Sequence, residues 1–345
     1  MTERVAGVRL APYTTLGLGG AARAFVEAGS AEEIVELVAE ADRAGEPVLV
    51  LGGGSNLVVS DEGFDGLVVR VASQGVEIDG DRVIAQAGED WDSLVERVGA
   101  EGRSGVECLS GIPGLVGSTP IQNVGAYGQD VSQTIIAVRV YDRRSGEVRD
   151  LTARECGFAY RHSAFKEELG RHVVLAVTYE LAGDALSGPI AYRELAVRLG
   201  VALGDRVPLA RARAAVLELR AGKGMVLDAA DPDTRSAGSF FTNPILTGGQ
   251  AAELELRAPG FPRWDMPDGA VKVPAAWLIE NAGFPKGYRR GPARISTKHT
   301  LAMTNPEMSA STEELLDLAR EVRDGVFEKF GVTLVNEPVM VGTRL

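Results

Sequence analysis

The segment of residues 111–130 constrains the fold most, because its glycines and prolines recur too often for a helix or a central strand. It is therefore predicted to be a loop. Loops longer than about 12 residues without secondary structure of their own are usually functional or disordered, and apolar residues such as Val116 and Ile121 argue against disorder. Small side chains would let the backbone approach a flat, polar ligand closely. Ligand binding is favoured over a surface connector, with hydrogen bonds offered by Ser118, Thr119, Gln122 and Asn123.

A second glycine-rich turn occupies residues 52–56 and directly follows an apolar run at residues 47–51, which is typical of a buried strand. Consecutive backbone N–H groups in such a turn can bind an anion, and Ser55 and Asn56 would add side-chain donors. A P-loop is excluded because no Gly-Lys-Ser/Thr follows. The glycine cluster of residues 14–22 fits GxGxxA, but a strand pattern follows it where a dinucleotide fingerprint needs a helix. The turn at residues 52–56 is therefore the predicted phosphate site.

Composition narrows the class of protein. The 345 residues correspond to roughly two or three domains. No apolar run reaches the ~18 residues of a membrane span, and the first residues lack the pattern of a signal peptide, so we expect a cytoplasmic protein without membrane insertion. Cys108 and Cys156 are too few for a disulfide framework, and three histidines give no metal-ligand pattern. The net charge of -12 argues against nucleic-acid binding, and an anionic small substrate would need a local basic pocket.

Hydrophobic periodicity predicts a mixture of helices and strands. Ser30 and Glu33 form a capping-box pattern that begins one helix, and residues 312–330 carry apolar side chains at helical spacing. The acidic, turn-rich segment of residues 227–233 is interpreted as a domain boundary. Further helices are expected at residues 91–98, 214–219 and 275–281, and strands at residues 23–27, 47–51, 67–70, 76–78, 83–86, 135–141, 148–151, 173–181 and 332–335.

Six motifs, in their joint order and spacing, closely resemble those of the UDP-N-acetylenolpyruvoylglucosamine reductase (UDP-N-acetylmuramate dehydrogenase, MurB) family, nearly from end to end. They lie at residues 16–20, 51–57, 111–130, 160–166, 238–244 and 336–338. The tyrosine-bearing insertion at residues 190–195 and the chain length resemble the longer subtype of this family.

The resemblance implies an α+β protein: a two-subdomain FAD-binding fold of the vanillyl-alcohol-oxidase/PCMH type, followed by a C-terminal α+β substrate-binding domain. The boundaries expected from it are residues 1–72, 73–224 and 225–345, with the option that the last strand packs back on the FAD domains. FAD would be bound noncovalently. The residues expected to bind it are Gly52, Gly53, Gly54, Ser55, Asn56, Ser118, Thr119, Gln122, Asn123 and Gly125.

The resemblance also implies an activity in peptidoglycan synthesis: NADPH, as co-substrate, would reduce the flavin, and the flavin would reduce UDP-N-acetylglucosamine enolpyruvate to UDP-N-acetylmuramate. Arg161 would stabilise the enolate that develops, since guanidinium is permanently cationic. Ser239 would protonate C2, and Glu337 would stabilise or help to protonate the intermediate. Without the motifs these three residues would be interpreted as an ion-paired surface arginine, a turn hydroxyl and a solvated carboxylate.

Substrate contacts are implied for four further residues, namely Tyr160, Tyr192, Asn243 and Lys286. Tyr192 would close over the uridine diphosphate, and Lys286 would add positive charge for the diphosphate. A monomer is expected. Two other classes remain open at this point, a flavin oxidase that uses oxygen and a noncatalytic flavin or nucleotide sensor. Neither class explains Ser239 and Glu337.

Overall fold

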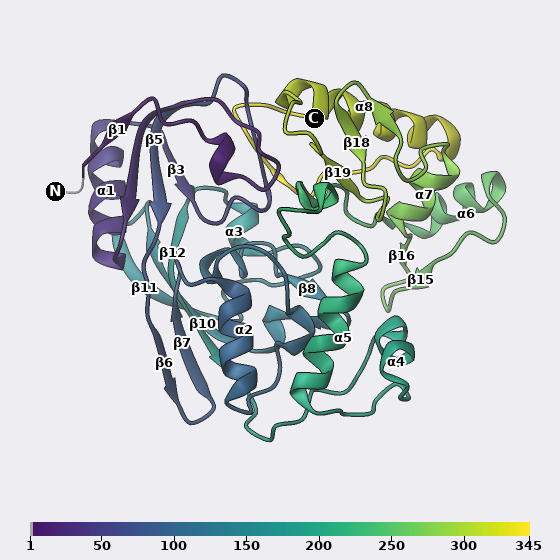
Figure 1. Ribbon diagram of the computed structural model, residues 1–345, viewed down its shortest axis with the longest axis horizontal. Coiled ribbons are helices and arrows are strands. Elements are labelled where there is room, and N and C mark those ends of the chain that lie inside the picture. Colours follow the sequence, from purple (N-terminus) through teal and green to yellow (C-terminus); the bar gives the residue numbers. More distant parts are fainter. Residues whose placement is uncertain (1–2) are drawn as a thin grey trace. The chain divides into compact units, whose positions relative to one another are not determined.

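The computed structural model describes residues 3–345, which divide into two compact units (Figure 1). Unit 1 comprises residues up to Val8, Ala22–Gly54 and Phe64–Gly222. Unit 2 comprises Arg9–Ala21, Ser55–Gly63 and Lys223–Leu345. The chain therefore leaves unit 1 twice in its N-terminal part before it enters unit 2 for good. The predicted three-domain boundaries, at residues 72 and 224, stay predictions.

Unit 1 begins with a four-stranded sheet of order β1-β2-β5-β3. Strands β2, β3 and β5 are parallel, and β1 pairs with β2 in the antiparallel sense. The sheet's bounds are β1 Val5–Ala6, β2 Ala22–Ala28, β3 Val48–Leu51 and β5 Phe64–Val71. Helix α1 (Ala31–Ala44) connects β2 to β3; the Ser30 side chain accepts a hydrogen bond from the Glu33 N–H at its start, and Gly45, at a φ of 67°, ends it. The capping signals thus predicted this helix correctly.

The second sheet of unit 1 is antiparallel, with the order β11-β10-β12-β7-β6. Its strands are β6 Val76–Asp79, β7 Arg82–Gln86, β10 Ile135–Asp142, β11 Glu147–Thr152 and β12 His172–Glu180. Helix α2 (Trp91–Ala100) buries Trp91, Leu94, Val95 and Val98. One hydrophobic core joins residues of both sheets with α1 and α2, so the glycine-rich turn that follows β3 starts from a packed strand.

A smaller core of unit 1 packs α4 (Arg193–Leu199) on α5 (Leu209–Ala221), and includes Cys108 and Ile190. The predicted helix began only at residue 214, but α5 begins at Leu209, directly after Pro208, a residue suited to helix starts because it fixes φ. The short helix α3 is Ala164–Glu167. The 3-10 turns and the remaining hairpin of unit 1 are η2 Glu107–Leu109, η3 Val116–Ser118, η4 Val131–Gln133, β8 Gly125–Ala126 and β9 Gln129–Asp130.

Unit 2 is built on an antiparallel sheet of order β13-β19-β18-β17, against which α8 (Thr312–Phe330) packs (Figure 1). Ser311 and Glu314 form a capping box at the start of α8, and Gly331 ends it. The sheet's strands are β13 Ser236–Ser239, β17 Arg289–Arg290, β18 Ala293–Ile295 and β19 Ala302–Thr304. Other elements of unit 2 are η1 Ala11–Tyr13, η5 Pro232–Thr234, β14 Ile245–Leu246, α6 Gly248–Arg257, β15 Trp264–Asp265, β16 Val271–Lys272 and α7 Ala275–Asn281.

The predicted final strand at residues 332–335 is wrong. Val332 and Leu334 are buried in the core of unit 2, but this segment forms no strand. The final strand is β20 (Val339–Val341), which starts after Pro338 and pairs in parallel with β4 (Leu57–Val59). Burial thus explains the apolar Val332 and Leu334, whereas Val335 is exposed.

No helix within residues 3–345 has both the length and the apolar character to cross a membrane.

Candidate active site

The segment of residues 111–130 is held as a defined loop on unit 1. Its secondary structure is limited to η3 and the two-residue strands of the β8–β9 hairpin. The backbone is nevertheless well anchored, because Val116 N donates to Glu89 O at 2.9 Å and Gly117 N donates to Ala87 O at 2.9 Å. A Cβ atom on Gly117 would lie 2.6 Å from the Cβ of Ala87. The segment therefore packs too closely on β7 and its end to be a mobile connector.

The two glycine-rich turns meet inside unit 1. A Cβ atom on Gly53 would lie 2.8 Å from the Cα of Gly114, and one on Gly52 would lie 2.7 Å from the Ser118 hydroxyl. Gly54 adopts a left-handed φ of 61°, a conformation that glycine adopts without strain. Such bare backbone at a strand end fits a pyrophosphate group, which is bound by backbone N–H groups at close approach. We refer to Gly52, Gly53, Gly54, Gly114 and Ser118 as the glycine cradle.

The last two residues of the predicted phosphate turn, Ser55 and Asn56, belong to unit 2. The carbonyl of Asn56 accepts a hydrogen bond of 2.9 Å from Val339 N, at the start of β20. This bond ties the C-terminal segment after Glu337 to the turn.

Two of the predicted cofactor residues use their side chains inside the loop. The Thr119 hydroxyl donates to Val116 O at 2.8 Å and lies 3.0 Å from the hydroxyl of the buried Tyr179, whose pKa is raised by burial. The Asn123 amide donates to Ala159 O at 3.1 Å, and its Oδ1 accepts from Ser132 N at 3.1 Å. Both side chains thus shape the loop, while Ser118, Gln122 and Gly125 are half-buried beside them.

Arg161 lies at the tip of a tight turn in which Ala159 and His162 exchange two backbone hydrogen bonds. Its φ of 52° is left-handed, and such strain in a non-glycine residue is concentrated at functional sites. Its guanidinium donates to Gly125 O at 2.7 Å and lies 5.6 Å from the ring centre of Tyr160. The turn therefore places a permanent positive charge directly on the predicted cofactor loop.

Two residues that the sequence did not single out belong to this cluster. Tyr127, whose φ is also left-handed at 49°, packs edge-on against Tyr192 with ring centres 5.4 Å apart. Burial raises the pKa of Tyr127 to about 12. Arg220, in the last turn of α5, has a pKa lowered to about 10 by burial and, further, by the nearby charge of Arg161. Tyr127 is the sole aromatic residue of segment 111–130, a signal that could have identified it.

In unit 2, Ser239 ends the short strand β13 and Glu337 lies beside it. The Phe240 carbonyl, one residue after Ser239, accepts a hydrogen bond of 2.9 Å from Glu337 N, and Phe241 forms a β-bridge with Asn336. Gly238 has a left-handed φ of 70°, so the backbone bends immediately before Ser239. Glu337 is buried and Ser239 is half-buried. The structure thus brings the two predicted catalytic residues of this unit to adjacent backbone positions.

The remaining predicted substrate contacts are spread over both units. Tyr160 and Tyr192, in unit 1, are exposed. In unit 2, Oδ1 of Asn243 accepts a hydrogen bond of 2.9 Å from Ala275 N, in the first turn of α7. Lys286 is exposed between α7 and β17. These four contacts stay predictions.

Comparison with protein families identifies the class. The model of an FAD binding domain matches residues 22–152, which include Gly52, Gly53 and Gly114 of the glycine cradle. Together the fold and this cradle define an FAD-dependent oxidoreductase. A second model, for the C-terminal domain of UDP-N-acetylenolpyruvoylglucosamine reductase, matches residues 231–341, which contain Ser239 and Glu337.

Relatives of the same name match the whole chain. UDP-N-acetylenolpyruvoylglucosamine reductase of Thermobifida fusca is 58% identical, covering 100% of this chain and 99% of the relative. That of Streptomyces coelicolor is 56% identical over 97% of this chain and 90% of the relative. The crystal structure of the Thermus caldophilus reductase (MurB) aligns with a TM-score of 0.68 at 28% identity, covering 99% of both chains. The chain belongs to the UDP-N-acetylenolpyruvoylglucosamine reductase family, and the predicted family, fold class and FAD cofactor are confirmed.

Proposed function

We propose that this protein reduces UDP-N-acetylglucosamine enolpyruvate to UDP-N-acetylmuramate with NADPH, a step of peptidoglycan synthesis. The observation that carries the proposal is the hydrogen bond from Glu337 N to Phe240 O, which places Glu337 next to the backbone of Ser239 and the left-handed Gly238, within the region matched by the reductase C-terminal domain. An oxidase or a flavin sensor needs neither a proton donor nor a buried carboxylate at these positions. The decisive assay is an anaerobic single turnover of the NADPH-reduced protein with the enolpyruvyl substrate, in which UDP-N-acetylmuramate is identified directly by mass spectrometry.

The glycine cradle supports binding of FAD, because an added Cβ on Gly52 or Gly53 would overlap with neighbouring atoms. Gly52, Gly53 and Gly54 would hold the pyrophosphate with backbone N–H groups. Ser118, Gln122 and Gly125 would contact the rest of the cofactor, on a backbone shaped by Thr119 and Asn123. When bound, FAD supplies the hydride transfer from NADPH to the enolpyruvyl double bond.

Arg161 acts on the charge of the substrate. Hydride addition at C3 leaves negative charge on C2 and on the adjoining carboxylate, and a fixed guanidinium stabilises that charge more than it stabilises the neutral double bond. Arg161 is suited to this because its hydrogen bond to Gly125 O and its left-handed backbone fix its position before substrate arrives. Arg220 would add a second positive charge, which a protein of net charge -12 needs locally for an anionic substrate.

Ser239 completes the reaction by donating a proton to C2. An unactivated hydroxyl is a weak acid, so its contribution depends on orientation, and a backbone fixed on both sides supports this role. Phe240, the next residue, is bonded to Leu301 on one side and to Glu337 on the other. The Glu337 carboxylate, on a buried residue, would help to deliver or replace this proton.

The nucleotide part of the substrate is assigned to the exposed aromatic and cationic residues. Tyr192 would cover the uridine diphosphate, held in place by its edge-on contact with Tyr127. Tyr160, the Asn243 amide and Lys286 would add contacts. We also propose that the protein acts as a cytoplasmic monomer, which gel filtration and cell fractionation would test.

A further inference from the structure

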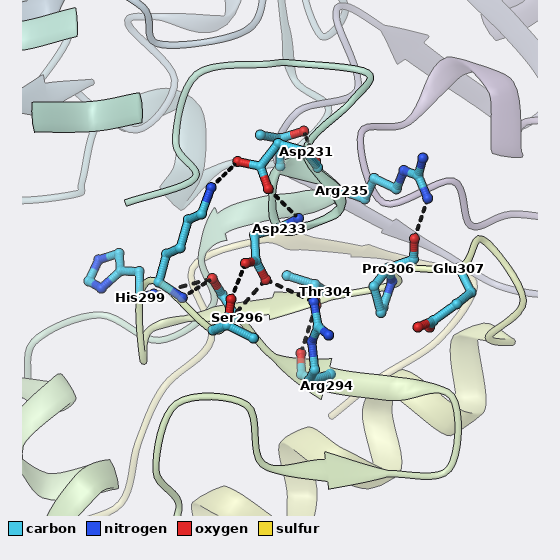
Figure 2. A network of polar contacts seen from close by, with 12 residues as sticks. Asp231, Asp233, Arg235, Arg294, Ser296, His299, Thr304, Pro306 and Glu307 are labelled. Carbon is cyan, nitrogen blue, oxygen red and sulfur yellow. Dashed lines mark hydrogen bonds and ion pairs between the residues drawn. The ribbon is translucent and has the colours of Figure 1, made fainter. Parts of the chain in front are cut away.

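A buried polar network centres on Asp233, in the 3-10 turn η5 (Figure 2). Asp233 is 3% exposed. Its Oδ1 accepts hydrogen bonds of 3.0 Å from Arg294 and 3.0 Å from Thr297 N, and its Oδ2 accepts from the Thr297 hydroxyl. Nearby, Oδ2 of Asp231 accepts from Lys298 Nζ at 2.6 Å. These donors offset the cost of burying a carboxylate, which would be large without them.

The network holds the turn between β18 and β19, residues 296–301. This turn is closed internally: the Ser296 hydroxyl oxygen accepts from Lys298 N at 3.0 Å and from His299 N at 3.2 Å. Ser296 N also donates to Ala302 O at 2.8 Å. Because Asp233 bonds to both the backbone and the side chain of Thr297, it fixes the whole turn relative to η5.

The other end of this turn contacts the predicted proton donor. Ala302 is the β-partner of Ser239, and Leu301 O accepts a hydrogen bond of 2.7 Å from Phe240 N. Strand β13, which carries Ser239, starts three residues after Asp233. Asp233, which precedes β13, is therefore hydrogen-bonded to Thr297 in the turn. Leu301 and Ala302, where the turn ends, pair with Phe240 and Ser239 at the end of β13.

Strand β13 needs such support because its own ladder is irregular. The pairing with β19 shifts register between Ser236 and Ser239, and Gly238 interrupts the extended backbone with its φ of 70°. A strand of four residues with a register shift and a left-handed glycine does not by itself fix the direction of its last side chain.

We propose that Asp233 is a positioning residue for Ser239, which it orients through the turn of residues 296–301. This inference rests on the proposed function, since it assumes that Ser239 is the proton donor. Asp233 touches neither the substrate nor the cofactor in this scheme. Its effect is confined to the step that uses the Ser239 hydroxyl.

The electrostatics agree with this task. Burial alone would raise the pKa of Asp233, but hydrogen bonds from Thr297 and the charge of Arg294 outweigh burial, so the pKa is lowered. The carboxylate is thus ionised at neutral pH. Asp233→Asn keeps the shape and one acceptor but removes the charge opposite Arg294 and one of the two carboxylate oxygens.

The test is a double-mutant cycle on two anaerobic stopped-flow phases: flavin reduction by NADPH, then flavin reoxidation by UDP-N-acetylglucosamine enolpyruvate. In Asp233→Asn we expect reduction within twofold of the parental rate and reoxidation slowed by about 10- to 100-fold, since a misplacement of about 1 Å can cost 10²-fold. In the Ser239→Ala background the same change should slow reoxidation less than about threefold, because coupled residues are not additive.

Glu321→Gln is the matched control. Glu321, on α8 in the same unit, accepts hydrogen bonds from Tyr288 at 2.7 Å and from Arg290 at 2.9 Å, and lies outside the turn network. Its loss should leave both phases unchanged. If Asp233→Asn folds poorly, judged by thermal unfolding, Thr297→Val removes one donor to the same carboxylate and should slow reoxidation selectively.

Three results would overturn the inference: equal slowing of both phases, additivity with Ser239→Ala, or parental reoxidation in Asp233→Asn and Thr297→Val. If Ser239→Ala itself reoxidises at the parental rate, the proposed role of Ser239 fails instead. The two failures are therefore distinguishable in one data set.

Discussion

Replacement of Arg161 separates function from stability, because the residue is both strained and charged. Arg161→Gly removes the left-handed strain at a φ of 52°, worth about 1–2 kcal/mol. It also loses the hydrogen bond to Gly125 O, about 1.5 kcal/mol for a charged donor at this half-buried site, and adds about 0.5–1 kcal/mol of chain entropy to the unfolded state. These opposing contributions predict a net destabilisation between about 0 and 1.5 kcal/mol in the free energy of unfolding.

The kinetic effect should be much larger. Loss of one preorganised donor to developing negative charge typically lowers kcat by about 10²–10³-fold. We expect Arg161→Gly to show this loss in flavin reoxidation by the enolpyruvyl substrate, with flavin reduction by NADPH nearly parental. Arg161→Lys keeps a positive charge without the planar fork, and should recover part of the rate.

Urea unfolding and anaerobic stopped flow on the same preparations provide both quantities. A destabilisation above about 3 kcal/mol in Arg161→Gly, or parental reoxidation, would show that Arg161 serves the fold and not the reaction.

Three further predictions concern the cofactor, the nucleotide and pH. The protein should be yellow and release FAD on acid denaturation. Gly53→Ala should bind FAD weakly, measured by flavin absorbance, because the added Cβ would lie 2.8 Å from the backbone of Gly114. The control is Gly99→Ala, whose added Cβ would meet open space. Tyr192→Phe should raise the KM for the UDP substrate and leave flavin reduction by NADPH unchanged; equal loss in both phases would make it structural. Burial lowers the pKa of His172, and the charge of Asp142 partly opposes this shift. The stability that the shift contributes is complete above the unfolded pKa of about 6.5, and it is lost as the pH falls through the lower pKa of the folded state. In thermal unfolding from pH 7 to 5, His172→Gln should flatten this pH dependence; a slope equal to that of the parent protein would refute the assignment.

Local signals in the sequence were sufficient for much of the fold. The capping pair Ser30/Glu33 and the helical spacing of apolar residues at 312–330 predict two helices whose starts the structure reproduces. The apolar Val332 and Leu334 misled because they reflect burial in the core, and burial alone does not specify a strand. The true strand β20 depends on pairing with β4, almost the whole chain away, which no local pattern encodes.

Sequence motifs can propose candidate site residues, but they cannot identify residues that only the fold brings together. Arg161, Ser239 and Glu337 stand in recognisable motifs, and the structure adds their backbone bonds. Arg220 lies in an ordinary helical pattern, and becomes notable only because α5 brings it near Arg161. Asp233 ends an acidic, turn-rich segment, and its burial depends on Thr297 and Arg294, more than 60 residues later.

The central claim is that the flavin of this protein reduces an enolpyruvyl ether and that the chain protonates it. The most direct measurement is an anaerobic single turnover in D₂O: protein reduced with NADPH is mixed with UDP-N-acetylglucosamine enolpyruvate, and the product is analysed by mass spectrometry and NMR. We predict UDP-N-acetylmuramate with deuterium at C2 of the lactyl group, formed as the flavin reoxidises, and a severe slowing of this phase in Ser239→Ala. Flavin that stays reduced with this substrate and is reoxidised by oxygen alone, without any lactyl product, would contradict the account.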